Sequence, residues 1–391
     1  MNRDTSPAHA RKIMLGFAGI TGLDPPGMHP GRYLWTDAFA VCNYLELYRT
    51  TREERWKDLA LRLVGQVHHS LGRHREDDER RGWISGLPEG EGEQHPTRGG
   101  LRIGKPLPER KPGEMYDERL EWDRDGQYFH YLTKWMHALN RVSRVTGDQK
   151  FNQWAIELAQ AAYAGFTYGH APGSGARMCW KMSIDLSRQL VPSMGQHDPL
   201  DGFITFSELQ LTAAQDFGQS QRLYLGSEIA GMADICRGQG IATDDPLGLG
   251  GLLSDALRVA SLMNRTGGGY GGLLETILDA AIPGVQSFAH SDIMKLPPGH
   301  RLAFRELGLA IGFAAPGRIL ALIEENPAAF GDMGHLHRRI KALAAYAPLG
   351  EAITEFWLDE RSQNTRTWVE HREINMVMLA TSLIPDGFLT I

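Results

Sequence analysis

Cysteine is scarce in this sequence. The 391 residues include three cysteines, Cys42, Cys179 and Cys236, which are odd in number and far apart. That pattern excludes a disulfide framework of the kind that holds small secreted domains together. The N-terminus also lacks the apolar segment of a signal peptide. We therefore expect free, buried thiols in a reducing compartment and a cytoplasmic location.

An excess of either charge is also missing. Lysine and arginine number 41 and aspartate and glutamate 47, so the formal net charge is -6. This mild imbalance gives no electrostatic case for a nucleic-acid partner. No apolar run approaches the roughly 18 residues of a membrane span, so no membrane partner is expected. Hydrophobic residues at 42% and charged residues at 23% are typical of a globular protein with a large core.

The motifs of metal and nucleotide sites are missing as well. Zinc sites are built from closely spaced ligands, and no Cys-x-x-Cys, His-x-x-x-His or His-Glu-x-x-His occurs. This argues against the zinc-dependent helical toroids, namely the prenyltransferases and the lanthionine cyclases. The glycine-rich run 267–272 lacks the Lys-Ser/Thr pair of a phosphate-binding loop, and there is no Gly-x-Ser-x-Gly elbow. We expect neither a metal nor another cofactor.

Helical periodicity fills most of the chain. Apolar residues recur at spacings of three and four, the period of a helix, and no convincing run of alternating strand residues lies between them. Helices are predicted near residues 33–48, 56–67, 125–146, 151–162, 201–216, 223–238, 248–265, 271–286, 301–324, 334–346, 349–359 and 367–384. Taken in pairs they form about six hairpins. The expected fold class is all-α, a closed (α/α)6 barrel or toroid in a single domain of residues 1–391.

The first two hairpins are related by an internal repeat. Four pairs of residues all differ by 95 positions: Thr51 and Thr146, Trp56 and Phe151, Ala60 and Ala155, Leu63 and Leu158. Residues of the same type at one constant offset indicate that a helical hairpin has been repeated.

Long segments interrupt the hairpins, and the longest is an insertion at about residues 72–122. It is rich in charge, glycine and proline, and its charge run at 73–81 is expected to be solvated surface. With 167–199, 286–300 and 358–366, it should lie on one rim of the barrel, above the starts of the inner helices. Loops on a rigid scaffold are the default place for a functional site.

One motif marks the start of the predicted helix 125–146. Asp123 and Asp125 stand there, where either carboxylate could cap the helix and suit the positive end of its dipole. The sequence Trp122-Asp-Arg-Asp-Gly-Gln-Tyr-Phe129, followed by Thr146-Gly-Asp148 and an alanine-rich helix, resembles the six-hairpin glycosidase superfamily. Within it, the motif is most similar to that of the unsaturated glucuronyl and rhamnogalacturonyl hydrolases.

The resemblance implies a carbohydrate-active enzyme, most simply a glycoside hydrolase. In those hydrolases the aspartate of the Asp-Gly-aromatic motif is the general acid/base, which implies that role for Asp125. The family's proline in that helix is missing, and Leu132 and Thr133 stand in its place. Glycoside hydrolysis normally uses two carboxylates, and the candidates for the second are Asp37, Asp198 and Asp201.

The other predicted site residues would bind the substrate. Trp35 opens the first helix in a register equivalent to the central motif, and its indole offers a flat face to a pyranose ring. The full set of substrate-binding candidates is Trp35, Asp123, Gln127, Lys181, Gln196, His197 and His371. The expected partner is a small carbohydrate or an oligosaccharide that contains uronic acid.

Two other functions stay open. A sugar epimerase of the N-acylglucosamine 2-epimerase type shares the architecture and would use histidine bases, for which His197 and His371 are candidates. A non-catalytic sugar-binding or scaffold toroid is the third possibility, because many functions share one scaffold. A hydrolase should show two facing carboxylates, an epimerase two histidines, and a binding protein aromatic residues without either.

Overall fold

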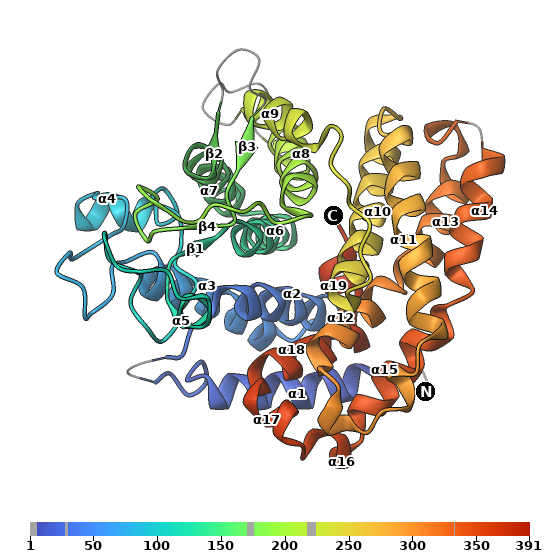
Figure 1. The fold of residues 1–391 in the computed structure, drawn as a ribbon, viewed down its shortest axis with the longest axis horizontal. Coiled ribbons are helices and arrows are strands. Elements are labelled where there is room, and N and C mark those ends of the chain that lie inside the picture. The colour runs from blue at the N-terminus through green and yellow to red at the C-terminus, as the bar shows by residue number, and fades with distance from the viewer. Residues whose placement is uncertain (1–5, 28–29, 170–175, 217–223, 332) are drawn as a thin grey trace. The chain divides into compact units, whose positions relative to one another are not determined.

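The computed structural model describes the chain except for five short segments: residues 1–5, 28–29, 170–175, 217–223 and 332. Helices dominate the described chain (Figure 1), which confirms the predicted all-α class. Contacts between Cα atoms are densest within two compact units, residues 18–239 and residues 1–17 together with 240–391. The expectation of a single domain stays a prediction.

Three consecutive hairpins make up most of the unit of residues 18–239. Their first helices are α2 (Leu34–Thr51), α6 (Phe129–Thr146) and α8 (Asp198–Asp216). Their second helices are α3 (Glu54–Leu71), α7 (Lys150–Phe166) and α9 (Gly226–Cys236). Helix α6 contacts both α2 and α8, and each second helix packs on the first helix of its own hairpin. An inner layer backed by an outer layer is the arrangement that the predicted (α/α)6 barrel requires.

The repeat extends over whole helices. Helices α2 and α6 each have 18 residues, and they start and end at positions that differ by 95. Their last residues, Thr51 and Thr146, make the same two hydrogen bonds. Each hydroxyl donates to a carbonyl four residues earlier at 2.7 Å and accepts from a backbone N–H two residues later at 3.2 Å. Left-handed residues, Arg52 and Gly147, then end the two helices.

The outer helices bury the apolar stripes that the repeat predicted. In α3 the buried residues recur every three or four positions: Trp56, Leu59, Ala60, Leu63, Val64 and Val67. In α7 the equivalent positions are filled by Phe151, Ala155 and Leu158, which are also buried. Burying one large apolar side chain contributes roughly 1.5–3 kcal/mol. The stripe therefore decides which face of each outer helix turns inward.

Two small sheets were not predicted. Strand β1 (Gln127–Tyr128) pairs with β4 (Lys181–Met182), which pairs with β5 (Gln189–Val191), and both pairings are antiparallel. Strand β2 (Thr167–Tyr168) pairs antiparallel with β3 (Arg177–Met178). Strands of two or three residues are too short to show the alternation from which a strand is predicted.

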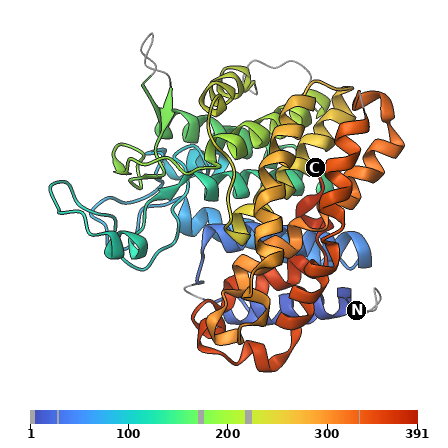
Figure 2. The same cartoon turned by 45° about the vertical axis from the view of Figure 1, so that its right-hand side comes forward.

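The insertion at 72–122 is mostly irregular but well packed. It holds two short helices, α4 (Glu89–Gln94) and α5 (Glu118–Asp123). Trp83, Leu101 and Ile103 anchor it in the core, where each is at most 2% exposed. Figure 1 shows this cyan segment beside the green strand β4, and Figure 2 shows the same cyan and green segments side by side. The longest loop of this unit thus lies at the starts of the inner helices, as expected.

The prediction that Asp123 or Asp125 caps α6 is wrong. Asp123 ends α5, and Tyr128 takes the cap position of α6 without a side-chain hydrogen bond. Strand β1 intervenes because Gly126 adopts a φ of 147°, where a Cβ would lie 2.7 Å from the carbonyl oxygen of Met182. The glycine of the Asp-Gly-aromatic motif therefore allows β1 to approach β4.

The second unit, residues 1–17 and 240–391, is also helical. Helix α10 contacts α11, α12 and α13, and α12 contacts α15 and α18. The helices are α1 (Ser6–Ile20, which begins in this unit), α10 (Pro246–Thr266), α11 (Gly271–His290), α12 (Ala303–Gly312), α13 (Ala315–Glu325), α14 (Met333–Ala344), α15 (Ala347–Leu358), α16 (Glu360–Gln363), α17 (Arg366–Glu370), α18 (Arg372–Leu383) and α19 (Asp386–Leu389), with short 3-10 turns at Ile293–Lys295, Pro298–His300 and Pro327–Ala329. The predicted helix 301–324 is thus divided into α12 and α13.

One stretch corrects the expectation that no apolar run has the length of a membrane span. Ala303–Glu325, with 23 residues, is long and apolar enough by length and composition to cross a membrane. However, 67% of its most apolar window is buried inside the protein. The core helix of a globular protein shows the same combination of length and burial.

The three cysteines are free thiols. Cys42 and Cys179 are buried, as expected, whereas Cys236 is partly exposed. Burial raises the pKa of the Cys179 thiol to about 11. Since the thiolate is the reactive form of cysteine, Cys179 is not a nucleophile at neutral pH.

Candidate functional site

Aromatic and ionisable side chains meet at the N-terminal ends of α2, α6 and α8. Tyr33 and Tyr128 hold the cap positions of α2 and α6, and Asp198 is the first residue of α8. His130 lies in the first turn of α6. Trp180 joins them because the pairing of β1 with β4 places Tyr128 opposite the next residue, Lys181. We name this group the helix-mouth cluster: Tyr33, Tyr128, His130, Tyr131, Trp180 and Asp198.

The rings of the cluster form a continuous, partly open surface. Trp180 stacks on Tyr128 with centroids 4.9 Å apart and on His130 with centroids 6.1 Å apart. Tyr131 meets the His130 ring edge-on at 4.7 Å. Tyr128 is buried, whereas Tyr131 and Trp180 are partly exposed and the His130 side chain is 29% exposed. The cluster therefore presents aromatic faces to a ligand from a rigid, stacked base.

A pair of phenols completes the aromatic side of the cluster. The hydroxyl oxygens of Tyr33 and Tyr131 lie 2.5 Å apart, and either one can be the donor. Burial raises the pKa of Tyr33 to about 12 and raises the pKa of Tyr131 well above its ordinary value. Both phenols therefore stay protonated at neutral pH, and the one that accepts the shared hydrogen bond keeps its own proton to donate.

His130 and Asp198 supply the acid–base chemistry. The Nδ1 atom of His130 lies 3.8 Å from Oδ1 of Asp198. Within the described part of the chain, neither Nδ1 of His130 nor Oδ2 of Asp198 has a hydrogen-bond partner. Burial, with the nearby charge of Asp201, raises the pKa of Asp198 to about 7, and burial lowers the pKa of His130 to about 4. Perturbed, unpartnered groups of this kind mark candidate proton-transfer sites.

Asp201, one turn further along α8, has a different environment. Its Oδ2 accepts hydrogen bonds from the hydroxyl of Thr133 and from Nζ of Lys134 at 2.8 Å. Both donors belong to α6, so Asp201 links the two inner helices and acts on Asp198 through its charge. Among the residues that the structure describes, no three His, Cys, Asp or Glu side chains are grouped so as to hold a metal ion.

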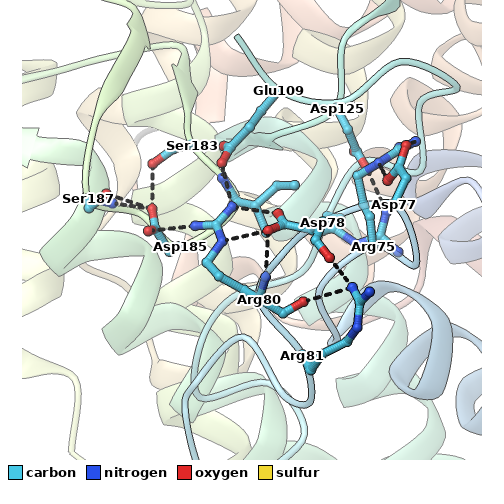
Figure 3. A network of polar contacts seen from close by, with 12 residues as sticks. Arg75, Asp77, Asp78, Arg80, Arg81, Glu109, Asp125, Ser183, Asp185 and Ser187 are labelled. Atoms are coloured by element: carbon cyan, nitrogen blue, oxygen red, sulfur yellow. Dashed lines mark hydrogen bonds and ion pairs between the residues drawn. The ribbon is translucent and has the colours of Figure 1, made fainter. Parts of the chain in front are cut away.

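Asp125, the predicted general acid, is a buried anchor whose side chain is 0% exposed. Its oxygens accept hydrogen bonds from five donors: the backbone N–H groups of Gly104, Lys105 and Gly126, and the guanidinium groups of Arg75 and Arg102. Figure 3 shows Arg75 reaching both Asp125 and Asp77. Hydrogen bonds from these donors occupy both oxygens of Asp125. Asp125 therefore holds the insertion against β1, and its contacts do not support a role as proton donor to a substrate.

The charge run at 73–81 is solvated surface only in part: Glu76, Asp77, Glu79 and Arg81 are exposed, as expected, whereas other members of the run make ion pairs. Arg80 binds Asp78 and Glu109 within the insertion and Asp185 in the segment after β4 (Figure 3). Although burial acts in the opposite direction, hydrogen bonds from two serines lower the pKa of Asp185 to about 2. The run therefore ties the insertion to the segment that carries Trp180.

Gln127 and Lys181, predicted to bind substrate, are engaged inside the protein and are 0% exposed. The side-chain amide of Gln127 bonds three backbone groups at 2.6–3.0 Å. The ammonium of Lys181 donates to a Glu121 carboxylate oxygen and to the carbonyls of Glu121 and Arg124 at 2.7–2.9 Å. No donor of either side chain remains for a substrate, so both residues position the backbone of the site.

Trp35 and Asp37 are also buried inside the protein. Trp35 is 7% exposed, and its ring lies 4.6 Å from that of Phe39. Asp37 is 1% exposed and accepts hydrogen bonds from the backbone N–H of Tyr33 at 3.0 Å and from Arg32 at 3.4 Å. A buried indole offers no face to a sugar, so the structure does not support the stacking role predicted for Trp35.

The remaining candidates belong to three separate segments of the chain. Asp123 and Gln196 are exposed and His197 is partly exposed, the last two directly before Asp198. His371 belongs to the other compact unit, where its ring lies 5.5 Å from that of Phe304. The pairing of His197 with His371 as two bases stays a prediction.

Of the helix-mouth cluster, only Asp198 was predicted as a site residue. The repeat contained a signal for others, because the same offset of 95 that relates Thr51 to Thr146 also relates Tyr33 to Tyr128. It places His130 at the position equivalent to Trp35. Trp180 could not be found in this way, because the two-residue strand that delivers it has no periodic pattern.

Comparisons with known proteins give remote likenesses. No protein-family model and no curated protein matches the sequence. Among solved structures, the chain is similar to a sugar epimerase from a ruminal bacterium, with 10% identity and a TM-score of 0.43 over 81% of this chain and 75% of that one. It is also similar to cellobiose 2-epimerase from Bacillus thermoamylovorans B4167, with 9% identity and a TM-score of 0.45 over 81% and 76% of the two chains.

Proposed function

We propose that the protein is a carbohydrate-active enzyme that moves a proton on the carbon next to a sugar carbonyl, as epimerases and isomerases do. The observation that carries the proposal is the facing of His130 and Asp198, 3.8 Å apart, beside partly exposed aromatic rings. Such a reaction needs a base, a group that stabilises its charged form, and a donor to the developing oxyanion. The helix-mouth cluster contains one candidate for each.

The roles follow from the protonation states. With a pKa lowered to about 4, His130 is neutral at pH 7 and can accept the proton from C2. The imidazolium then returns a proton to C1, which gives the ketose, or to the opposite face of C2 after the enediolate has turned, which gives the epimer. Asp198, which ionises near pH 7, then stabilises the imidazolium that forms. Tyr33 and Tyr131 stay protonated and share one hydrogen bond, so the phenol that accepts it keeps a proton that it would donate to the enediolate oxygen. Trp180 would hold the apolar face of the sugar ring.

Glycoside hydrolysis is the second candidate function. It is favoured by Asp198, because a carboxyl group with a pKa of about 7 can deliver a proton to a leaving group. Hydrolysis also calls for a second carboxylate across the sugar from the first. Asp201 lies on the same helix turn and is bonded to Lys134, and Asp125 is occupied by five donors, so the contacts of the described carboxylates fit this reaction less well.

The two candidates separate in heavy water. A panel of aldoses and disaccharides is incubated with the protein in D2O and followed by proton NMR. Proton transfer should exchange the C2 hydrogen for deuterium and produce the epimer or the ketose. Release of monosaccharide from a disaccharide without exchange would instead establish hydrolysis. If no sugar of the panel exchanges or is cleaved, the proposal of an enzyme is contradicted.

Substitutions at His130 and Asp198 test the catalytic role proposed for each residue. His130→Gln should lower exchange at least about a hundredfold, the usual scale of general acid–base catalysis. In the wild-type protein the rate should rise as the pH passes about 7, because Asp198 must ionise to stabilise the imidazolium. Asp198→Asn should remove that rise. Exchange that keeps the same pH dependence in Asp198→Asn would show that Asp198 has no such role.

A further inference from the structure

The aromatic surface of the helix-mouth cluster continues outward to Trp122. This tryptophan is 50% exposed, although its indole is one of the largest apolar side chains of the chain. Its ring centroid lies 5.2 Å from that of Trp180, with the planes at 73°. Trp180 in turn stacks on Tyr128 and His130. The rings thus lead without a break from the acid–base pair to an exposed indole.

A buried ion pair fixes the two tryptophans relative to each other. Glu121 precedes Trp122 and Lys181 follows Trp180, and the Lys181 ammonium lies 2.9 Å from Oε1 of Glu121. The Lys181 side chain is 0% exposed and that of Glu121 is 4% exposed. Arg110 binds the other carboxylate oxygen of Glu121 at 3.0 Å. Trp122 is therefore held by the same backbone that positions Trp180, and its exposure is not that of a loose surface residue.

A second connection holds the segments that carry the two rings. Arg80 and Glu109 belong to the insertion that ends at Trp122. Arg80 donates to Asp185 (Figure 3), and Glu109 accepts from the backbone N–H of Ile184, four residues after Trp180. The Glu109 bond to Ile184 is 2.6 Å long. We name Trp122 and Trp180 the tryptophan pair. The two segments that carry them are held together by these contacts.

We propose that Trp122, the exposed member of the tryptophan pair, binds a second sugar ring, so that the substrate is a saccharide of two or more units whose reacting unit lies at His130 and Trp180. A pyranose presents C–H groups to an indole face and hydroxyl groups at its edge. Asp123, exposed and next to Trp122, supplies a carboxylate that accepts hydrogen bonds from such hydroxyls. This inference rests on the proposed function only for the chemistry at the inner unit.

The test compares matched sugars of one and two units by calorimetric titration of the full-length protein. The probes are glucose with cellobiose, mannose with mannobiose, and N-acetylglucosamine with chitobiose. In at least one pair the disaccharide should bind about tenfold more tightly, which is the scale of one stacked aromatic contact with its buried area. Trp122→Ala should bring that ratio close to one, and Trp122→Phe should restore much of it.

A matched control removes another exposed apolar side chain of the insertion. Met115 is 88% exposed, so Met115→Ala should leave the ratio of affinities as it is in the wild-type protein. Equal affinities within all three pairs, no binding of any probe, or a ratio that Trp122→Ala does not change would overturn the inference.

The outcomes separate this inference from the proposed function. If Trp122→Ala abolishes the preference for a disaccharide while no sugar exchanges its C2 hydrogen in D2O, the two-unit site stands and the proton-transfer function fails. If monosaccharides exchange and no disaccharide binds more tightly, the function stands and the tryptophan pair has no role in substrate length.

Discussion

The first helices of the first and second hairpins, α2 and α6, have the same length and the same kind of C-terminal end, but different residues stand at their starts. The repeat offset of 95 places Trp35 and His130 at equivalent positions, two residues after the tyrosines that begin α2 and α6. Trp35 is 7% exposed and packs on Phe39, whereas the His130 side chain is 29% exposed and faces Asp198. The repeat therefore gives the two positions the same place at the start of a helix. The residue type and its neighbours determine whether the side chain packs in the core or faces an ionisable group.

The neighbours of each helix start explain the difference. The insertion lies against the start of α2, where the backbone N–H of Leu34 donates to the carbonyl of Ile103 at 3.0 Å. The start of α6 instead continues from β1, which pairs with β4 and brings Trp180 beside His130. The start of α2 is thus covered by the backbone of the insertion, whereas the start of α6 is lined with aromatic rings that are partly exposed.

The largest expected effect tests whether Trp35 is a core residue. Trp35→Ala should lower the free energy of unfolding by about 3–5 kcal/mol, because it leaves a cavity in a packed region. Chemical denaturation measures this directly. A Trp35→Ala protein of near wild-type stability that binds sugars poorly would restore the stacking role and contradict the contrast with His130.

The next largest effect is expected from Asp198, the carboxyl group with a raised pKa at the start of α8. A raised pKa means that the folded protein binds a proton more tightly than the unfolded chain, so stability is lost as the pH rises from about 4 to about 7. Asp198→Asn removes the cost of ionisation and should stabilise the protein by up to about 4 kcal/mol at pH 8, with little change at pH 4. Unfolding curves at the two pH values give the answer. A difference that does not depend on pH would mean that the Asp198 carboxyl is not perturbed.

The Asp125→Asn variant tests whether Asp125 has a structural role or acts as a general acid. Asp125→Asn takes a charge away from the buried guanidinium of Arg102 and should lower the free energy of unfolding by about 3 kcal/mol. The control is Asp123→Asn, since Asp123 is exposed and should change stability by less than about 0.5 kcal/mol. Loss of turnover in Asp125→Asn with unchanged stability would support the general-acid role implied by the sequence motif.

The smallest effect tests the repeat itself. Thr51→Ala and Thr146→Ala each remove the same pair of hydrogen bonds, and each should cost about 1 kcal/mol. The two losses, measured by denaturation, should agree within about 0.5 kcal/mol because the local geometry is the same. Clearly unequal losses would show that the two helix ends are not equivalent.

The sequence predicted the helices because apolar stripes with a period near 3.6 extend over three or more turns, as in α3 and α7. It did not predict β1 and β4, whose two residues each show no period. The site was harder to predict for a related reason. The Asp-Gly-aromatic motif drew attention to Asp125, but the glycine serves strand pairing and the aspartate is tied up by Arg75 and Arg102. Asp198 was predicted because it stands at a helix start among polar residues.

His130, and not Trp35 at the equivalent position of the repeat, is the proposed base. The most direct measurement is the rate of solvent deuterium uptake at C2 of a sugar that the wild-type protein turns over, for His130→Gln and Trp35→Phe in parallel. The prediction is a loss of at least about a hundredfold in His130→Gln and a near wild-type rate in Trp35→Phe, which keeps an aromatic ring in the core. Near wild-type deuterium uptake in His130→Gln would contradict the claim.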